Sequence, residues 1–197
     1  MKDEDYDSFE PTYPLSRDTK FIAWVDDLRT LPVSVVSIRQ AKATAEDARR
    51  VKDLQALCPP ITVRAVRDNA LTIADRLVLL ADVSGTHVGF CVARPGVRAS
   101  DPIFVQVVAV APDAQRRGIG LALLTAAAER WPQRNLVFAT QDDNSEARAM
   151  NEKFARVIGA EIRRINLRTY PDRYLGIQRG WGYRAWMIVR GTNGTAC

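Results

Sequence analysis

The sequence predicts a mixed α/β fold. Segments rich in β-branched residues, which are typical of strands, occur between segments whose apolar residues recur at helical spacing. In addition, a strand-like apolar segment ending at Pro112 is separated from an Ala- and Leu-rich helical segment only by a short glycine-containing loop. Because 47% of the 197 residues are hydrophobic, the chain can bury the core that such a fold requires.

The N-terminal residues divide the chain into a leader and one domain. Residues 1–16 are acidic, contain Pro11 and Pro14 and show no apolar period, so we expect a flexible leader there. A single domain is expected over residues 17–197. It begins with a short amphipathic helix over residues 20–31, whose apolar residues at helical spacing are Phe21, Trp24, Val25 and Leu28.

Caps and turns mark the elements that follow, up to residue 93. Thr44 is expected to cap a helix that ends at Pro59 and Pro60, and Ser84 and Gly85 are typical of a hairpin turn. The expected elements are a strand over 33–39, the helix after Thr44, a weaker helix over 66–74, and strands over 76–83 and 86–93.

The remaining elements alternate between strands and helices. Asn144 is expected to cap a helix that Gly159 closes, and residues 168–182 are rich in arginine and aromatic residues. The expected elements are a central strand over 103–111, a helix over 119–131, a strand over 135–140, the helix after Asn144, and strands over 161–167 and 183–189.

Residues 115–120, of sequence Gln-Arg-Arg-Gly-Ile-Gly, form a loop at a helix N-terminus. The first N–H groups of a helix lack intrahelical partners and the helix dipole adds positive charge, so such a junction can bind phosphate groups. Gly118 and Gly120 remove Cβ atoms that would keep a ligand from the backbone, and Arg116 and Arg117 add positive charge. We therefore expect this loop to bind a pyrophosphate.

The loop differs from two common nucleotide-binding motifs. No Lys-Ser or Lys-Thr pair follows Gly120, as a P-loop would need, and Leu123 stands where a dinucleotide-binding loop has its third glycine. A third pattern, Gln/Arg-x-x-Gly-x-Gly/Ala, matches at every specified position. The alternative interpretation is a surface loop whose glycines only turn the chain.

With Val110 to Pro112 before it and Leu123 and Leu124 after it, this loop resembles the acyl-CoA-binding motif of the GNAT superfamily of N-acetyltransferases. The resemblance covers residues 33–190 approximately. It implies that residues 17–197 form a GNAT-like acyltransferase domain with a mixed, mostly antiparallel central sheet flanked by helices on both faces. It also implies acetyl-CoA as acyl donor and no metal.

The resemblance further implies which residues hold acetyl-CoA. Backbone groups of Val108 to Val110 would pair with the pantetheine arm, and an N–H near Val110 would polarise the thioester carbonyl. The glycine loop would bind the pyrophosphate. The expected binding residues are Val108, Ala109, Val110, Gln115, Arg116, Arg117, Gly118, Ile119, Gly120, Leu121, Asn144 and Asn151.

A second family motif matches the helix after Asn144 with one departure. Asn151 stands where the family usually has a Tyr that protonates or hydrogen-bonds the departing CoA thiolate. An amide can donate a hydrogen bond to sulfur but delivers no proton at neutral pH. Either Asn151 stabilises the thiolate while water or a tyrosine such as Tyr183 supplies the proton, or catalysis is weak or absent.

The general base is not identified by the sequence. Many relatives have a Glu on the central strand, whereas this strand offers Gln106, which cannot take a proton. Glu161 and Asp101 are expected to be surface or capping residues, and His87, the single histidine, is expected to be exposed or half-buried. Deprotonation through water is equally compatible with the sequence.

Composition limits partners and location. The net charge of +5 suits an anionic cofactor, and no nucleic-acid-binding motif is present, so nucleic acid is not an expected partner. The odd number of cysteines indicates neither a disulfide framework nor a metal site; Cys58 and Cys91 are expected in the core. Without a signal peptide or a membrane-length apolar segment, we expect a cytoplasmic protein. Its expected partners are acetyl-CoA or CoA and an amine acceptor, with a homodimer as one expected assembly.

The leading functional hypothesis is an enzyme that transfers an acetyl group directly from acetyl-CoA to an amine of a small molecule, protein or peptide. The alternative is a non-catalytic acyl-CoA-binding module for sensing or assembly. Five aromatic residues either line an acceptor pocket or, as we favour, cover the sheet edge: Tyr170, Tyr174, Trp181, Tyr183 and Trp186.

Overall fold

A seven-stranded sheet runs through the computed structural model, which describes residues 18–191. The leader expected over residues 1–16 lies outside these residues. In strand order β1-β2-β3-β4-β5-β7-β6, β4 and β5 are parallel and every other neighbouring pair is antiparallel. The strands are β1 (Val36–Gln40), β2 (Leu77–Val83), β3 (Thr86–Pro95), β4 (Ile103–Val110), β5 (Leu136–Gln141), β6 (Glu161–Ile165) and β7 (Tyr183–Val189).

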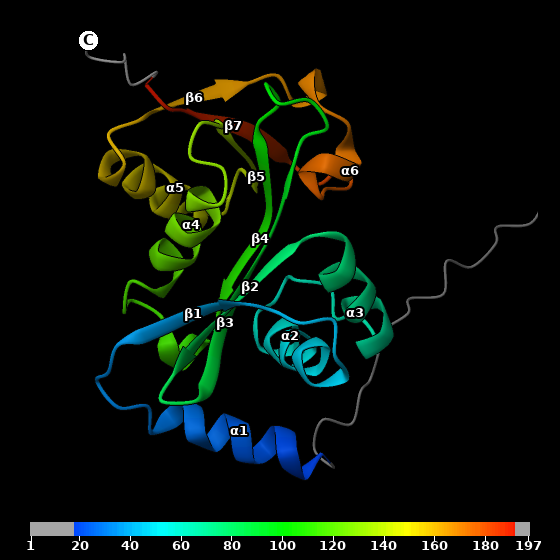
Figure 1. The fold of residues 1–197 in the computed structure, drawn as a ribbon, viewed down its shortest axis with the longest axis vertical. Helices are drawn as coiled ribbons and strands as arrows, with labels where there is room; N and C mark the ends of the chain where they lie inside the picture. Colours follow the sequence, from blue (N-terminus) through cyan, green and yellow to red (C-terminus); the bar gives the residue numbers. More distant parts are fainter. Residues whose placement is uncertain (1–17, 192–197) are drawn as a thin grey trace, which may run out of the picture.

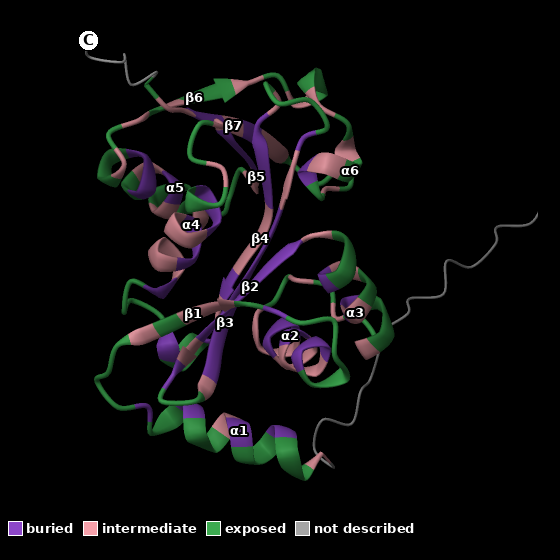
Figure 2. Cartoon of the chain, viewed as in Figure 1, coloured by how far each residue is buried: buried purple, intermediate pink, exposed green. Residues whose placement is uncertain are grey.

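Helices cover both faces of this sheet, as predicted. The helices are α1 (Thr19–Arg29), α2 (Ala45–Leu57), α3 (Val66–Asp75), α4 (Ile119–Glu129), α5 (Ser145–Val157) and α6 (Asp172–Leu175). Figure 1 shows α4 and α5 on one face, α2, α3 and α6 on the other, and α1 across one end. The central strands are buried between these layers (Figure 2).

Local sequence signals account for the helix boundaries. The side chain of Thr44 accepts a hydrogen bond from the N–H of Asp47, and that of Asn144 from the N–H of Ala147, so both predicted caps are confirmed. The start of α1 was not predicted from a cap, yet Asp18 accepts hydrogen bonds from two first-turn N–H groups. No helix among residues 18–191 is long and apolar enough to cross a membrane.

The first strand is shorter than the sequence predicts. It begins at Val36 and not at Val33, and the side chains of Val33 and Val35 are fully or almost fully exposed. Val36 pairs with Val83, the last residue of β2 before the hairpin turn. Residues 33–35 therefore have no partner strand, and their β-branched composition alone does not extend the sheet.

Candidate active site

The parallel strands β4 and β5 separate within the sheet. They pair only where Ile103, Phe104 and Val105 face the first half of β5. Beyond Val105, β4 stays paired with β3, and the end of β5 pairs with β7. A cavity of about 1160 Å³ is lined by both strand ends, so it lies at the carboxyl ends of two parallel strands, where ligands commonly bind.

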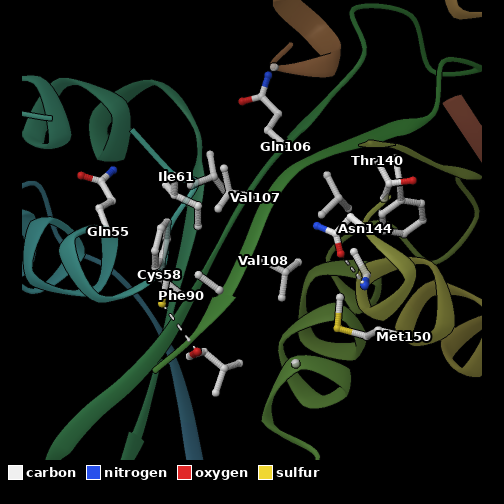
Figure 3. Close-up of a pocket in the computed structure, with 18 of the residues that line it drawn as sticks. Gln55, Cys58, Ile61, Phe90, Gln106, Val107, Val108, Thr140, Asn144 and Met150 are labelled. Atoms are coloured by element: carbon white, nitrogen blue, oxygen red, sulfur yellow. Dashed lines mark hydrogen bonds between the residues drawn. The ribbon is translucent and has the colours of Figure 1, made fainter. Parts of the chain in front are cut away.

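Gln106 forms a β-bulge at the point of separation. On β3, Val92 faces Val107 and the next residue, Ala93, faces Val105, so Gln106 has no partner residue. The bulge shifts the alternation of side chains along β4. Figure 3 shows Val107 on the side of Cys58 and Ile61, and Val108 on the side of Asn144 and Met150.

The backbone of β4 offers polar groups to the cavity. The N–H of Ala111 donates to the carbonyl oxygen of Val88 on β3, at 2.8 Å. Because hydrogen bonding alternates along an antiparallel pair, the backbone groups of Val108 and Val110 point away from β3, toward the gap, and those of Ala109 point toward β3. The carbonyl oxygen of Val110 accepts from the Gln115 amide (3.2 Å) and the Cys58 thiol (3.5 Å).

The N-terminus of α4 is open to a ligand. Its cap residue, Gly118, has φ of 78°, in the left-handed region that favours glycine, and no side chain caps the helix. Arg116 is also left-handed, with φ of 62°. The first-turn N–H groups, including those of Ile119, Gly120 and Leu121, are therefore available to an anion, and these residues line the cavity.

Gly120 has a packing role in addition to the expected one. A Cβ atom at this position would lie 2.7 Å from the sulfur of Met150 on α5. The absence of a side chain therefore lets α4 and α5 approach each other closely, beside Val108 and Val110. Gly120 therefore serves the packing of two helices as well as the predicted approach of a ligand.

The two arginines of the loop lie differently. Arg116 is exposed and lines the cavity. Arg117 is not among the lining residues; its guanidinium donates to the carbonyl oxygens of Leu31 (3.4 Å) and Pro32 (3.1 Å). Arg117 thus links the loop to the segment that follows α1.

Asn151 and Tyr183 line the same cavity from two different elements, α5 and β7. Asn151 is 3% exposed, and its side chain has no hydrogen-bond partner among residues 18–191. Its amide atoms are not fully enclosed by the protein, so they are accessible from the cavity to a ligand. Asn144 also lines the cavity, with its oxygen engaged in capping α5 (Figure 3).

The opposite wall of the cavity was not predicted. It consists of α3 and the loop that precedes it, including Cys58, Ile61, Arg64 and Arg76. Cys91 is buried as expected, whereas Cys58 is only partly buried, and burial raises the pKa of its thiol to about 11. A thiol protonated at neutral pH serves here as a hydrogen-bond donor and not as a nucleophile.

The described residues contain one carboxylate on the cavity wall, that of Glu146 in the first turn of α5. Glu161 is exposed and Asp101 accepts a hydrogen bond from the N–H of Arg98, so both are surface or capping residues as expected. His87 lies outside the lining and is 9% exposed. The prediction of an exposed or half-buried His87 is therefore wrong, because Trp24 of α1 covers its ring.

The aromatic residues near the C-terminus have separate roles. Tyr170 and Tyr174 pack on Phe104, with ring centroids 4.9 and 5.1 Å apart, so they cover the sheet as favoured. Trp186 lies under the guanidinium of Arg148, and Trp181 is 58% exposed. Of the five, Tyr183 lines the cavity. Among residues 18–191 no group of three or more metal-binding side chains occurs.

Several solved structures resemble this one. A diaminobutyrate acetyltransferase from Paenibacillus lautus, in complex with L-2,4-diaminobutyric acid and coenzyme A, has a TM-score of 0.60 at 20% identity and covers 79% of this chain and 95% of its own. A ribosomal-protein-S18-alanine N-acetyltransferase from Escherichia coli has a TM-score of 0.54 at 19% identity and covers 81% of this chain and 98% of its own. A Bacillus subtilis acetyltransferase in complex with CoA has a TM-score of 0.54 at 17% identity and covers 79% of this chain and 98% of its own.

These likenesses show a shared fold. No curated protein sequence matches the chain. The model of the acetyltransferase (GNAT) family, however, matches residues 45–155, more than half of the sequence. This segment contains the bulged strand, the open end of α4 and most of α5. The chain therefore belongs to the GNAT family of acetyltransferases.

Proposed function

We propose that this protein is an N-acetyltransferase that moves the acetyl group of acetyl-CoA directly to an amine of a small molecule, protein or peptide. The observation that carries the proposal is the gap between β4 and β5 with the uncapped N-terminus of α4 at one end. Two of the similar structures contain coenzyme A, which fits this use of the gap.

Along the cavity, successive residues would bind the pyrophosphate, the pantetheine arm and the acetyl group of acetyl-CoA. The first-turn N–H groups of α4 and the side chain of Arg116 would bind the pyrophosphate. The carbonyl oxygen of Val108 and the N–H of Val110 would pair with the pantetheine arm as an added strand, since the carbonyl oxygen of Val110 is already bonded within the protein. The acetyl group would then lie near the bulge, between Asn151 and Tyr183.

Transfer needs one bond to form and one to break. The neutral amine attacks the thioester carbonyl carbon, the carbonyl oxygen takes negative charge, and the outward backbone N–H of Val108, next to the bulge, stabilises it. The C–S bond then breaks with its electron pair on sulfur, and the ammonium proton leaves to water or to a base. The Asn151 amide would donate a hydrogen bond to the thiolate, and the Tyr183 hydroxyl would supply its proton.

The alternative is a module that binds acyl-CoA without turnover. It is favoured by two features of the site: an amide stands at position 151, and the bulge carries Gln106 and no carboxylate. Glu146 lies on the cavity wall, but in the first, exposed turn of α5. A cytoplasmic location and a homodimer remain predictions of the sequence.

Two measurements on the full chain distinguish these functions. Thermal unfolding is followed with acetyl-CoA and CoA, and CoA release is followed with a panel of amines. The enzyme hypothesis predicts stabilisation together with acceptor-dependent CoA release and an acetylated amine by mass spectrometry. Stabilisation without turnover of any amine would favour the binding module, and no stabilisation by either compound would contradict both.

A further inference from the structure

We infer that the acceptor is a small amine that also carries a carboxylate, and that Arg76 and Arg64 recognise this carboxylate. The inference rests on the proposed function, because it assigns the acceptor side of the same cavity. It follows from the distribution of charge on the cavity wall and from the way both arginines are held.

The two sides of the cavity differ in charge. On the side of α4 and α5, the lining residues include Arg116 and Lys153, which suit the phosphates of CoA, and the carboxylate of Glu146. On the side of α3 and its preceding loop, the charged residues in the described lining are Arg64 and Arg76. An acceptor that enters beside α3 therefore meets positive charge, which attracts an anionic group.

Arg76 is held by a neutral partner. Its Nη1 donates to the Oε1 of Gln106 at the bulge, and its side chain is 25% exposed. Its nearest carboxylate, Asp75, lies 3.4 Å from Nε and is itself 66% exposed, so it compensates the charge only weakly. A carboxylate at position 106 would neutralise Arg76, whereas the amide found there leaves the charge for a ligand.

The Gln106 side chain is fixed in this orientation. Its Nε2 donates to the carbonyl oxygens of Arg173 (3.0 Å) and Tyr174 (2.8 Å). Since its NH₂ group is directed to these carbonyls, its oxygen must face Arg76. Gln106 precedes Val108 by two residues, about 7 Å along a strand. Because it bonds Gln106, the guanidinium of Arg76 lies at the bulge, beside the position proposed for the acetyl group, which suits a short acceptor.

Arg64 is positioned through its backbone. Its N–H donates to the Oε1 of Gln55 (3.0 Å), and its carbonyl oxygen accepts from the Nδ2 of Asn69 (3.5 Å). Gln55 and Asn69 are buried and bond each other through both amides, each at 3.1 Å. Two buried amides therefore hold the loop so that Arg64 faces the cavity from beside α3.

This arrangement also bears on the missing base. Two arginines against one carboxylate leave an excess of positive charge, which favours the neutral form of the bound amine. A carboxylate on the acceptor offsets the repulsion during binding. A neutral or polycationic amine has no such compensation and binds less well.

The test uses matched acceptors on the full-length protein. α-Amino acids and ω-amino acids of increasing chain length are each compared with the corresponding carboxamide and with the amine that lacks the carboxylate. Aminoalkyl phosphates form a further arm. kcat/KM is measured for the wild type and for Arg76→Gln, Arg76→Lys and Arg64→Gln. Arg67→Gln is the control, because Arg67 lies on α3 but is exposed and outside the cavity lining.

We expect at least one amino acid to exceed its carboxamide by about ten-fold or more in kcat/KM, as a charge-assisted pair provides. Arg76→Gln should remove most of this preference, Arg64→Gln part of it, and Arg67→Gln none. Arg76→Lys should retain part of it. The acetyl-CoA-dependent rise in Tm should persist in all four variants, which shows that they fold and bind the donor.

Three outcomes would overturn the inference. They are a preference for neutral or cationic amines, a carboxylate preference that survives both Arg76→Gln and Arg64→Gln, and a preference for aminoalkyl phosphates over carboxylates. In each of these the acetyltransferase function would stand. Failure to acetylate any amine despite donor binding would instead overturn the proposed function, and this inference with it.

Discussion

Trp24 of α1 lies parallel to His87 of β3, with ring centroids 4.4 Å apart, and its indole N–H donates to the carbonyl oxygen of His87 at 3.0 Å. The family model begins at residue 45, so α1 precedes the matched segment. The stacked pair nevertheless joins this helix to β3, at the end of the strand next to the hairpin turn. The residues before the family core are thus part of the packed structure.

Trp24→Ala should lower the free energy of unfolding by about 3 kcal/mol, because it removes a large buried side chain and leaves a cavity beside His87. Urea titration measures the change. Ile22→Ala, on the same helix but 43% exposed, is the control and should change stability by less than about 0.5 kcal/mol. Equal effects of the two substitutions would show that α1 is not anchored by Trp24.

The buried His87 should contribute a loss of stability between pH 7 and pH 5. Burial lowers the pKa of its imidazole to about 3, well below the value of 6.5 in an unfolded chain. At this imidazole the unfolded state binds more protons between these pH values, so its contribution to the free energy of unfolding falls by about 2 kcal/mol from pH 7 to pH 5. Asp53, whose pKa burial raises to about 6, partly offsets this loss, because its folded state binds more protons in the same range. His87→Phe, which keeps a ring against Trp24, should remove this decrease. An unchanged slope in the variant would assign the pH dependence elsewhere.

Arg116→Gln and Arg117→Gln should have different effects, although the sequence suggests equal roles. Arg116 lines the cavity, so its loss should weaken CoA binding and reduce the salt dependence of the Kd. Arg117 binds the carbonyl oxygens of Leu31 and Pro32, so its loss should cost about 1 kcal/mol of stability and change the Kd less. Calorimetric titration with CoA separates them; a larger loss of affinity for Arg117→Gln would contradict the assignment.

Gly118→Ala should destabilise the protein by about 1 kcal/mol and weaken CoA binding several-fold, since alanine disfavours the φ of 78° found at the start of α4. Gly85→Ala is a matched control: its φ is 87°, but it lies in a hairpin turn outside the cavity lining. It should reduce stability similarly without a change in the Kd for CoA. A normal Kd for Gly118→Ala would separate this glycine from ligand binding.

Asn151→Ala should lower kcat about ten-fold, as expected for loss of one hydrogen bond to a charged thiolate, with a smaller effect on the Kd of CoA.

Tyr183→Phe removes the proposed proton donor and should shift the basic limb of the pH–rate profile. Stopped-flow assays at several pH values distinguish the two variants. If neither changes kcat, the thiolate is stabilised by other groups.

Features that depend on neighbours in the sequence could be predicted, and features that depend on packing could not. The caps at Thr44 and Asn144 and the glycine loop before α4 are set by a few adjacent residues. Arg64 and Arg76 carry no local motif; they reach the site because α3 packs against α2 and β2, which places both ends of the helix at the cavity. The burial of His87 could not be predicted, because the alternation of side chains along a strand does not show which helix packs over a given residue.

The bulge at Gln106 changes which residues of β4 face each side of the sheet. Before it, Phe104 faces the layer of α6; after it, Val108 and Val110 face α4, on the opposite side. Deleting Gln106 would make the pairing with β3 continuous, since Val105 and Val107 already face adjacent residues of that strand, and every later residue of β4 would keep its partner and its face. The donor side would therefore stay in place while the acceptor side lost the amide that orients Arg76, so the one extra residue of this strand serves the acceptor and not the donor.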